Sequence, residues 1–481
     1  MHSHIIIGDS HSDTQHTVER RHPLTDKVVT TAAAASEAQS LEAVEAAQAA
    51  FTEWSATPPA QRRDILNKAA DIMEKRTEDF VEAMCAEVVC APGWAHFNVF
   101  LTIQVLREAA GISARMVGET IPSNQPGTLS MTVRQPVGVV FSMAPWNAPG
   151  VLGMRSLAYP LACGNTVVFK GSELSPRTHE ILVEVLLEAG VPAGAVNYIV
   201  NRPEDAPTIV EKVIAHPAVR RVNFTGSSRV GAIIGEVAGR YLKPALLELG
   251  GKSPIVVLDD ADIDKAVDAA VFGKFFFQGQ ICMSTERVIL AEAIADEFIE
   301  KFAARVKELT HGNPTEDPSV DVGPVIVPAA GERNATLVKS AVDAGATLVC
   351  GGTIEGASVE PTILDGVTPE MDIYATETFA PITTIIRVDD DAEAVKTAND
   401  TAYGLVAAVH SGNAKRGLDV ALQIQAGSVH INGATVANDA NAPFGGLKNS
   451  GYGHFDGSKV IDEFTNLRWV TIEDPAQGYP L

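Results

Sequence analysis

The chain has 481 residues, enough for about three domains of ordinary size, and 46% of them are hydrophobic while 20% are charged. This composition is typical of a globular protein and excludes a disordered or fibrous one. The 37 lysines and arginines face 60 aspartates and glutamates, a formal net charge of −23, so no nucleic-acid partner is expected.

No stretch of the sequence approaches the roughly 18 apolar residues that a membrane span needs. The first residues lack the basic segment and the long apolar run of a secretory signal. The five cysteines are too few and too scattered for a disulfide framework. We therefore expect a protein of the reducing cytoplasm, without a membrane partner.

The first part of the chain, to about residue 110, is expected to be mostly helical. Ser36 and Gln39 have the spacing of a capping box, and the apolar residues that follow them have helical periodicity. A second amphipathic stretch follows at residues 65–84.

Beyond a loop at residues 122–127, short apolar runs alternate with segments of helix length. This alternation is the pattern of βαβ units in a parallel sheet, whose strands are buried on both faces. The runs are residues 137–141, 166–169, 196–200, 222–224 and 246–249. The sequence therefore predicts a doubly wound α/β domain.

A second α/β series starts near residue 255, and its strands are expected at residues 288–290, 382–388, 405–409 and 428–431. A last strand at 464–472 needs the edge of another strand, and residues 128–134 are the candidate. Such an isolated strand indicates pairing between subunits, as a homodimer or homotetramer. The expected units are a first domain from 1–118 and 137–248, a second from 249–463, and a β arm from 119–136 and 464–481.

Cys282 is a candidate nucleophile. It follows Gln278-Gly279-Gln280-Ile281 in a predicted loop between a Phe-rich helix and the next strand. Most free cysteines are small buried hydrophobic residues. That interpretation is kept for Cys85, Cys90, Cys163 and Cys350.

Glu248 ends a predicted parallel strand, at the edge where α/β sheets build their sites. Alone, Glu248 with the following Leu249-Gly250-Gly251-Lys252 fits a turn that carries a solvated acid. Beside a cysteine nucleophile, its carboxylate could activate the water that hydrolyses a thioester.

Polar residues also follow three other predicted strands. Asn147 is either a helix cap or an amide donor to an oxyanion. Lys170 and Glu173 are either exposed charges or ligands of ribose hydroxyls. The segment 225–231 runs from a strand into a helix and suits a phosphate, although the usual Gly-x-Gly-x-x-Gly motif is absent.

Taken together, these residues resemble the aldehyde dehydrogenase superfamily over nearly the whole chain. The matching strings are Pro145-Trp146-Asn147, Lys170-x-Ser172-Glu173, Phe224-Thr225-Gly226-Ser227, Glu248-Leu249-Gly250-Gly251-Lys252, Gly279-Gln280-x-Cys282, Glu377-x-Phe379-x-Pro381 and Pro443-Phe444-Gly445-Gly446. Further strings, Gly93-Trp94, Gly153-Met154-Arg155, Leu467-Arg468-Trp469 and residues 121–124 and 278–287, resemble the vanillin and salicylaldehyde dehydrogenase branch. The chain departs from the family pattern at Gly171, Phe277, Ala380 and Phe455.

The resemblance implies a Rossmann-like cofactor domain, an α/β catalytic domain and a β oligomerisation arm. It implies that Cys282 is the nucleophile, that Asn147 and the Cys282 backbone N–H form the oxyanion hole, and that Glu248 is the base. The residues it assigns to the cofactor are Trp146, Lys170, Glu173, Thr225, Gly226, Ser227, Gly231, Leu249, Glu377 and Phe379.

The implied cofactor is NAD rather than NADP, because the carboxylate of Glu173 would repel a 2′-phosphate. Helix N-termini and NAD⁺ near Cys282 would lower the pKa of its thiol. No metal is expected.

The substrate side of the predicted site is apolar. Trp94, Met154, Phe276 and Met283, together with Phe97, are candidates for an acyl pocket, although each also fits a plain core role.

Arg155 lies in an otherwise apolar helix, where a lone charge needs a partner. It either pairs with an acid or orients a ring hydroxyl or phenolate. The expected activity is oxidation of an aromatic aldehyde such as vanillin or salicylaldehyde to the acid, through a cysteine thiohemiacetal and thioester. The alternatives are a semialdehyde or aliphatic aldehyde dehydrogenase and a catalytically silent structural protein on this fold.

Overall fold

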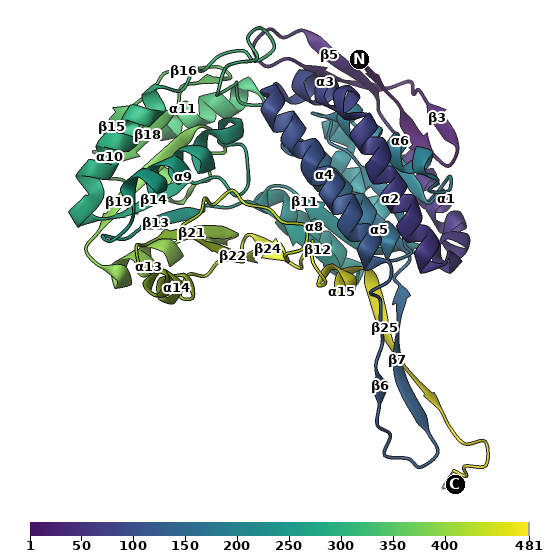
Figure 1. Cartoon of the computed structure of the whole chain (residues 1–481). Coiled ribbons are helices and arrows are strands. Elements are labelled where there is room, and N and C mark those ends of the chain that lie inside the picture. The colour runs from purple at the N-terminus through teal and green to yellow at the C-terminus, as the bar shows by residue number, and fades with distance from the viewer. Residues whose placement is uncertain (480–481) are drawn as a thin grey trace.

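The structure, a computed structural model, describes residues 1–479; residues 480–481 of the expected arm lie outside the described residues. Two lobes stand side by side, each built on a twisted, mostly parallel sheet with helices packed against it (Figure 1). A thin β arm projects from the lobe that contains the N-terminus (Figure 1).

The first lobe begins with strands, which the prediction of a mostly helical start did not include. They are β1 (His2–Ser3), β2 (Ile5–Ile7), β3 (Ser10–Ser12), β4 (Thr17–Arg21) and β5 (Val28–Ala33). The expected helices follow as α1 (Glu37–Ala56), α2 (Pro59–Lys75), α3 (Thr77–Val88) and α4 (Pro92–Ile112). The capping box is confirmed, because Ser36 Oγ accepts the N–H of Gln39 while Gln39 Oε1 accepts the N–H of Ser36.

The main sheet of this lobe has the order β24-β12-β11-β8-β9-β10-β2-β3. Its parallel strands are β8 (Val139–Met143), β9 (Thr166–Lys170), β10 (Val196–Ile199), β11 (Val219–Thr225) and β12 (Ala245–Glu248). The helices that accompany them are α5 (Pro149–Ala162), α6 (Pro176–Ala189), η1 (Pro203–Asp205), α7 (Ala206–Ala215) and α8 (Ser228–Arg240). All five predicted strands are confirmed, and the strand order changes direction at β8.

The second lobe has a seven-stranded sheet in the order β15-β18-β19-β14-β13-β21-β22. Its strands are β13 (Pro254–Val257), β14 (Arg287–Ala291), β15 (Thr347–Cys350), β18 (Thr362–Asp365), β19 (Ile382–Val388), β21 (Val406–His410) and β22 (Ser428–Ile431). The helices are α9 (Ile263–Phe275), η2 (Phe276–Gly279), α10 (Glu292–Lys307), α11 (Pro328–Asp343), α12 (Asp372–Ala375), α13 (Asp391–Asn399) and α14 (Ala414–Ala421). Strands β15 and β18 were not predicted.

Short segments complete this half of the chain. They are β16 (Ile354–Glu355), β17 (Ser358–Val359), β20 (Tyr403–Gly404), β23 (Leu447–Lys448), β24 (Gly451–Tyr452) and α15 (Val460–Phe464). Although β24 falls in the predicted second domain, it pairs antiparallel with β12 and forms an edge of the first sheet. Strand β24 therefore joins the second half of the chain to the first sheet, in addition to the covalent connection between the lobes.

Helix α5 packs closely against α4, and this contact fixes the position of its side chains. At Gly150 a Cβ atom would lie 2.7 Å from Thr102 Oγ1 and 2.9 Å from the Phe80 ring, so only glycine allows α5 to approach α4 this closely.

None of the helices within residues 1–479 combines the length and apolar character that a bilayer crossing requires.

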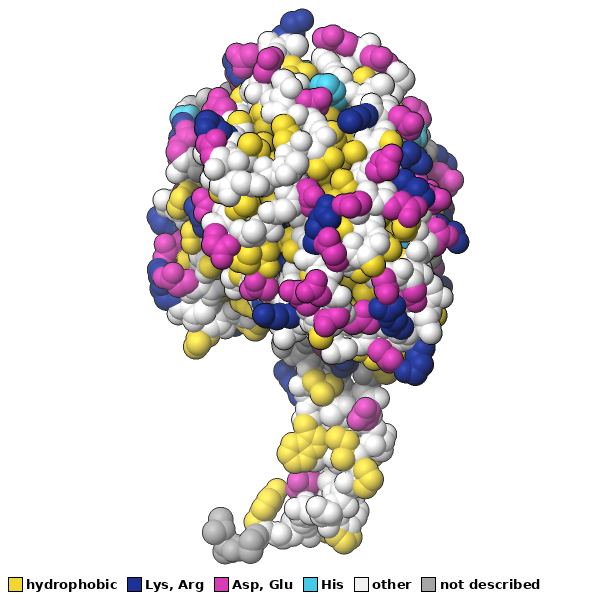
Figure 2. All heavy atoms as spheres, turned by 90° about the vertical axis from the view of Figure 1, so that its left-hand side faces the viewer, with side chains coloured by type: hydrophobic (Ala, Val, Ile, Leu, Met, Phe, Trp, Pro, Cys, Tyr) yellow, Lys and Arg dark blue, Asp and Glu magenta, His cyan; other side chains and the backbone are white. Residues whose placement is uncertain are grey.

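The arm consists of β6 (Thr120–Ile121), β7 (Leu129–Pro136) and β25 (Thr465–Ile472). The predicted pairing is confirmed, since β25 runs antiparallel to β7 in an unbroken register from Thr465 opposite Pro136 to Ile472 opposite Leu129. Hydrophobic side chains stand out along the arm (Figure 2). Trp469 in β25 is 70% exposed.

Candidate active site

A cavity of about 420 Å³ lies where the ends of the first sheet meet the second lobe. Strands β8 and β11 are neighbours at the point where the strand order reverses, and the segments that follow them diverge and leave a crevice. The predicted site residues that line it are Trp146, Asn147, Thr225, Gly226, Ser227, Glu248, Leu249, Cys282, Glu377 and Phe379.

A second, narrower cavity of about 40 Å³ adjoins the first and is largely apolar. Its lining includes Trp94, Phe97, Val151, Arg155, Met283, Val436, Asn438 and Phe444. Asn147, Leu152 and Cys282 line both cavities. Cys282 therefore stands between a wide space and a narrow aromatic one.

The loop that carries Cys282 has an unusual backbone. Phe277 and Gln278 have φ values of 49° and 54°, and Gly279 follows with a φ of 69°. A Cβ atom on Gly279 would lie 2.3 Å from the carbonyl oxygen of Ala380, so this position requires glycine. The Gln280 side chain then fixes the loop, because its Oε1 accepts the N–H of Ile326 at 2.8 Å.

Asn147 is directed at this loop rather than at a helix end. Its Nδ2 donates to the carbonyl oxygen of Gln280 at 2.9 Å. Helix α5 has Ala148 at its N-cap and no side-chain cap, so the helix-cap interpretation of Asn147 is wrong. An amide nitrogen has two hydrogens, so one can fix the side chain while the second serves a substrate oxygen beside Cys282.

Glu248 is buried at the end of β12, and neither of its carboxyl oxygens has a hydrogen-bond partner among the described residues. Burial raises the pKa of Glu248 to about 8. Arg155 opposes this rise, and the nearby carboxyl groups of Glu377 and Asp456 add to it. A carboxyl group of this kind changes protonation near neutral pH, which is what a general acid or base needs.

The same surroundings act on Cys282. Burial raises the pKa of the Cys282 thiol well above its usual range, the carboxyl groups of Glu248 and Glu377 raise it further, and Arg155 lowers it. The protein's own groups therefore favour the thiol, contrary to the lowering expected from helix ends. A positive charge brought into the wide cavity would favour the thiolate.

Glu377 faces the wide cavity from the second lobe. Its Oε1 accepts the N–H of Gly251 at 2.9 Å, and burial raises its pKa to about 7. Behind it, Lys252 and Lys274 donate to Glu286 at 2.8 and 2.7 Å. Although burial raises the pKa of Glu286, the two lysines bring it down to about 2, so this buried network stays charged.

Three of the predicted cofactor residues do not line the cavity. Lys170 Nζ lies 4.0 Å from the carboxylate of Glu173. Gly231 has a packing role, because a Cβ atom there would lie 2.4 Å from the Leu249 side chain. The start of α8 is nevertheless at the cavity, where Ser227 caps the helix by accepting the N–H of Val230.

On the substrate side, Trp94 connects the narrow cavity to Asn147. Its Nε1 donates to the Asn147 carbonyl oxygen at 3.1 Å, and its ring stacks on Phe277 with centroids 4.8 Å apart. Phe276 meets the Trp94 ring edge-on at 5.0 Å, outside the cavity lining. Met154 is fully buried in the core and lines neither cavity, so the structure does not place it at the substrate.

For Arg155, the expected pairing with an acid is confirmed, and its orientation of a ring hydroxyl stays a prediction. Its guanidinium forms an ion pair with buried Asp456, contacts Asn438 and lies 4.9 Å from the centroid of the Phe444 ring. The same residue lines the narrow cavity. Asp456 also accepts a hydrogen bond from Tyr159 at 2.7 Å.

Other residues of both cavities were missed by the sequence reasoning, because all but one lie outside the recognised strings and they come together only in the fold. They are Leu152, Ile326 and Arg333 at the wide cavity, Val436, Asn438 and Phe444 at the narrow one, and Asp456 behind it. Only Phe444 lies in a matching string, and it received no role there.

Two departures from the family pattern have local explanations. At Gly171 a Cβ atom would lie 2.7 Å from the ring of Tyr198, so a larger residue does not fit there. Phe277 supplies the ring that stacks on Trp94.

Comparison with known proteins agrees with this geometry. The model of the "Aldehyde dehydrogenase family" matches residues 10–470. Salicylaldehyde dehydrogenase of Pseudomonas sp. (strain C18) is 52% identical over 98% of this chain and 97% of its own. Vanillin dehydrogenase of Pseudomonas sp. (strain HR199) is 51% identical over the whole of both chains. The crystal structure of a salicylaldehyde dehydrogenase from Pseudomonas putida G7 complexed with salicylaldehyde superposes with a TM-score of 0.99, at 50% identity over the whole of both chains.

The fold, the two cavities that meet at Cys282 and the similarity to these dehydrogenases define an oxidoreductase. The chain belongs to the aldehyde dehydrogenase family, whose enzymes use NAD or NADP. The wide cavity fits such a dinucleotide. The start of α8, capped by Ser227, suits a phosphate, the ring of Trp146 suits a flat group, and the carboxyl group of Glu377 suits ribose hydroxyls.

Proposed function

We propose that this protein oxidises hydroxylated aromatic aldehydes to carboxylic acids with NAD. The observation that carries the proposal is the position of Cys282 and Asn147, which line both the wide polar cavity and the narrow aromatic one. An aldehyde carbon in the narrow cavity therefore has the sulfur, an amide donor and the space for a nicotinamide beside it.

The cofactor would be held by residues from both lobes. Ser227 at the start of α8 would contact the pyrophosphate, Trp146 the face of the dinucleotide, and Glu377 with Phe379 the nicotinamide ribose. Glu173, beside Lys170, would bind the adenosine ribose and disfavour a 2′-phosphate, which supports NAD over NADP. When bound, the nicotinamide supplies the chemistry of accepting a hydride.

The residues of this chain perform the covalent steps. The thiolate of Cys282 adds to the aldehyde carbon, and the oxygen becomes an alkoxide that the free Nδ2 hydrogen of Asn147 and the Cys282 N–H stabilise. Loss of hydride leaves a thioester on Cys282. Glu248, once deprotonated, takes a proton from water, whose oxygen attacks the thioester and releases the carboxylic acid and the thiolate.

The lining of the narrow cavity favours a flat, aromatic substrate. Trp94, Phe97 and Phe444 provide ring faces, while the guanidinium of Arg155 and the amide of Asn438 provide polar atoms at its end. These can orient a ring hydroxyl. The relatives named for salicylaldehyde and vanillin, whose ring hydroxyls stand at different positions, support this substrate class.

A semialdehyde is a poorer fit for a specific reason. Its carboxylate would need a free cation, but Arg155 is already neutralised by the buried carboxylate of Asp456. A catalytically silent protein is disfavoured because Cys282, Glu248 and Asn147 all line an accessible cavity.

The test is to measure kcat/KM for salicylaldehyde, vanillin and succinate semialdehyde, each with NAD⁺ and NADP⁺. We expect the aromatic aldehydes to be preferred and NAD⁺ to be the better oxidant. A clear preference for the semialdehyde would refute the substrate class, and a preference for NADP⁺ would refute the role of Glu173.

We also propose that the arm joins subunits into a homodimer or homotetramer. Its strands expose Leu467, Trp469 and Ile472, which are 59%, 70% and 55% exposed in the single chain. Apolar surface of this kind is usually covered in an assembly. The rest of the chain would then form a cofactor domain of residues 1–118 and 137–248 and a catalytic domain of residues 249–463. Light scattering that shows only monomers would refute the role of the arm in joining subunits.

A further inference from the structure

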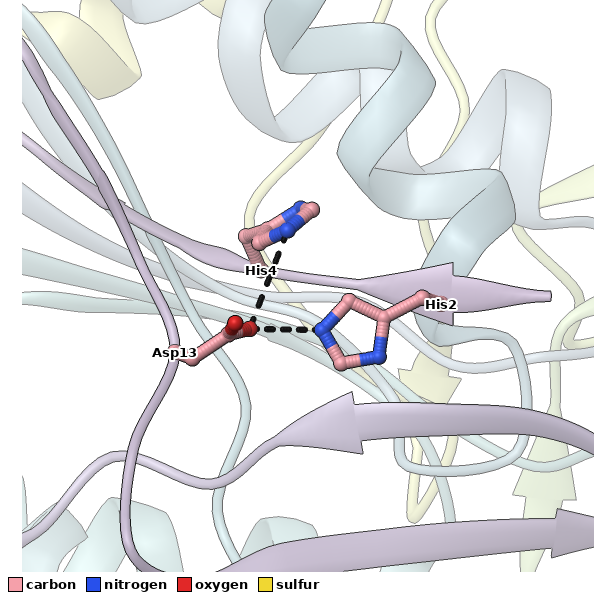
Figure 3. Close-up of side chains that lie close together, drawn as sticks. All are labelled: His2, His4 and Asp13. Carbon is pink, nitrogen blue, oxygen red and sulfur yellow. Dashed lines mark hydrogen bonds and ion pairs between the residues drawn. The ribbon is translucent and has the colours of Figure 1, made fainter.

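Three potential metal ligands lie together in the N-terminal segment, and no step of the proposed mechanism uses them. His2 in β1, His4 between β1 and β2, and Asp13 after β3 each offer one ligand atom, and these atoms all lie within 4.8 Å of one another (Figure 3). No metal was expected from the sequence, because the aspartate joins the two histidines only when β3 folds back antiparallel on β2.

The distances are close to those of a metal site. His2 Nε2 lies 2.6 Å and His4 Nε2 lies 3.7 Å from the same oxygen of Asp13, Oδ1. Ligand atoms of a tetrahedral zinc site are about 3.3 Å apart, given bonds of roughly 2.0–2.1 Å. Since the side chains of His2 and Asp13 are 44% and 69% exposed, small rotations can bring all three atoms to that separation.

A buried carboxylate orients His4 for this role. Glu180 Oε1, on α6, lies 3.1 Å from His4 Nδ1 and also accepts the His4 backbone N–H at 3.1 Å. The second oxygen of Glu180 is paired with Arg177 at 2.7 Å. With Nδ1–H donating to Glu180, the lone pair of Nε2 points toward Asp13, as in the carboxylate–histidine arrangement of many metal sites.

We propose that His2, His4 and Asp13 bind one divalent metal ion such as Zn²⁺ or Co²⁺. The ion would link strand β1 to the β2–β3 hairpin. Two imidazoles and one carboxylate suit Zn²⁺ or Co²⁺, whereas Mg²⁺ and Ca²⁺ prefer oxygen ligands alone. Solvent water completes the coordination at this exposed position. Glu180 is a positioning residue that acts through His4.

The experiment uses the full-length chain without a histidine tag, stripped of metal with a chelator and titrated with Co²⁺ and Zn²⁺. We expect one ion per chain by calorimetry, and a thermal transition that rises with metal concentration. His4→Asn and Asp13→Asn should weaken binding at least about tenfold, and Glu180→Gln by about 10–100-fold. His16→Asn, at an exposed histidine outside the cluster, is the matched control and should bind normally.

Three outcomes would overturn the proposal. The first is metal binding that the His4 and Asp13 variants leave unchanged, and the second is the absence of binding, which would make the cluster a surface ion pair only. A sulfur-to-cobalt charge-transfer band would identify a thiolate such as that of Cys282 as the ligand instead and also overturn it. The His4→Asn variant should keep its full dehydrogenase activity, which separates this site from the active site.

Discussion

Replacement of Glu248 by glutamine tests the proposed base and its electrostatics at once. The substitution keeps the shape of the side chain, which has no hydrogen-bond partner to lose among the described residues. It removes the group that accepts a proton from the hydrolytic water but leaves Cys282 and Asn147 in place. We therefore expect formation of the thioester to continue and its hydrolysis to slow.

The size of the effect follows from the chemistry and from burial. Loss of a positioned general base should lower the steady-state rate by about 10²–10⁴-fold. The same substitution should stabilise the fold. The pKa of Glu248 is about 8 in the folded chain and 4.5 in the unfolded chain, so at pH 7 folding must return a proton to this carboxylate. This proton uptake lowers the free energy of unfolding by about 3 kcal/mol.

The sign of this pH dependence is definite. Because folding raises the pKa of Glu248, its contribution to stability is fully present below pH 4.5 and is lost as the pH rises through about 8. Glu248→Gln should therefore gain stability over the wild type at pH 7 and lose that advantage near pH 4.

The assay is stopped-flow absorbance of NADH with salicylaldehyde. We expect Glu248→Gln to show a burst of one NADH per active site followed by slow turnover, and the wild-type rise of the hydrolysis rate toward pH 8 should disappear. Glu236→Gln, whose side chain is 74% exposed, is the control and should behave as the wild type. Unchanged steady-state turnover without a burst would refute the assignment of Glu248 as the base.

Three further substitutions test other parts of the molecule. Asn147→Ala should lower kcat by about 10²–10³-fold in steady-state assays; an unchanged kcat would remove it from the oxyanion hole. Arg155→Met leaves Asp456 buried without its cation and should destabilise the fold by about 3–5 kcal/mol in denaturant unfolding. Adding Asp456→Asn should restore most of that loss. Equal stability of the single variant and the wild type would contradict a buried ion pair. Trp469→Asp should shift the assembly toward monomers in light scattering, and an unaltered mass would place the subunit interface elsewhere.

The parallel sheets were predictable from the sequence because fully buried strands are continuous apolar runs. Residues 166–169 form such a run and lie in buried β9. Residues 382–388 and 428–431 form strands with the predicted bounds, although β22 is only half-buried. The strands of residues 2–33 were missed, since β3 has the sequence Ser-His-Ser and β4 carries two arginines and a glutamate. Such short edge strands depend on neighbours that no local pattern reveals.

The site residues divide in the same way. Asn147, Glu248 and the 225–227 segment follow strands, so their place at one edge of a sheet was predictable. Asp456 and Asn438 come from loops late in the chain and meet Arg155 only through the tertiary fold. The need of Arg155 for a partner was therefore predictable, but the identity of that partner was not.

The electrostatics of the site connect stability with catalysis. Burial raises the pKa of Glu248, Glu377 and Asp456 together, and the pKa of Cys282 rises with them. Arg155 is the cation that opposes this trend for Cys282, Glu248 and Asp456, and it is already paired with Asp456. A positively charged ring entering the wide cavity would favour the ionised forms of Cys282 and Glu248, because both face that space. Without such a charge, the arrangement favours the thiol of Cys282, the proposed nucleophile. The buried acids lower the stability of the fold at neutral pH.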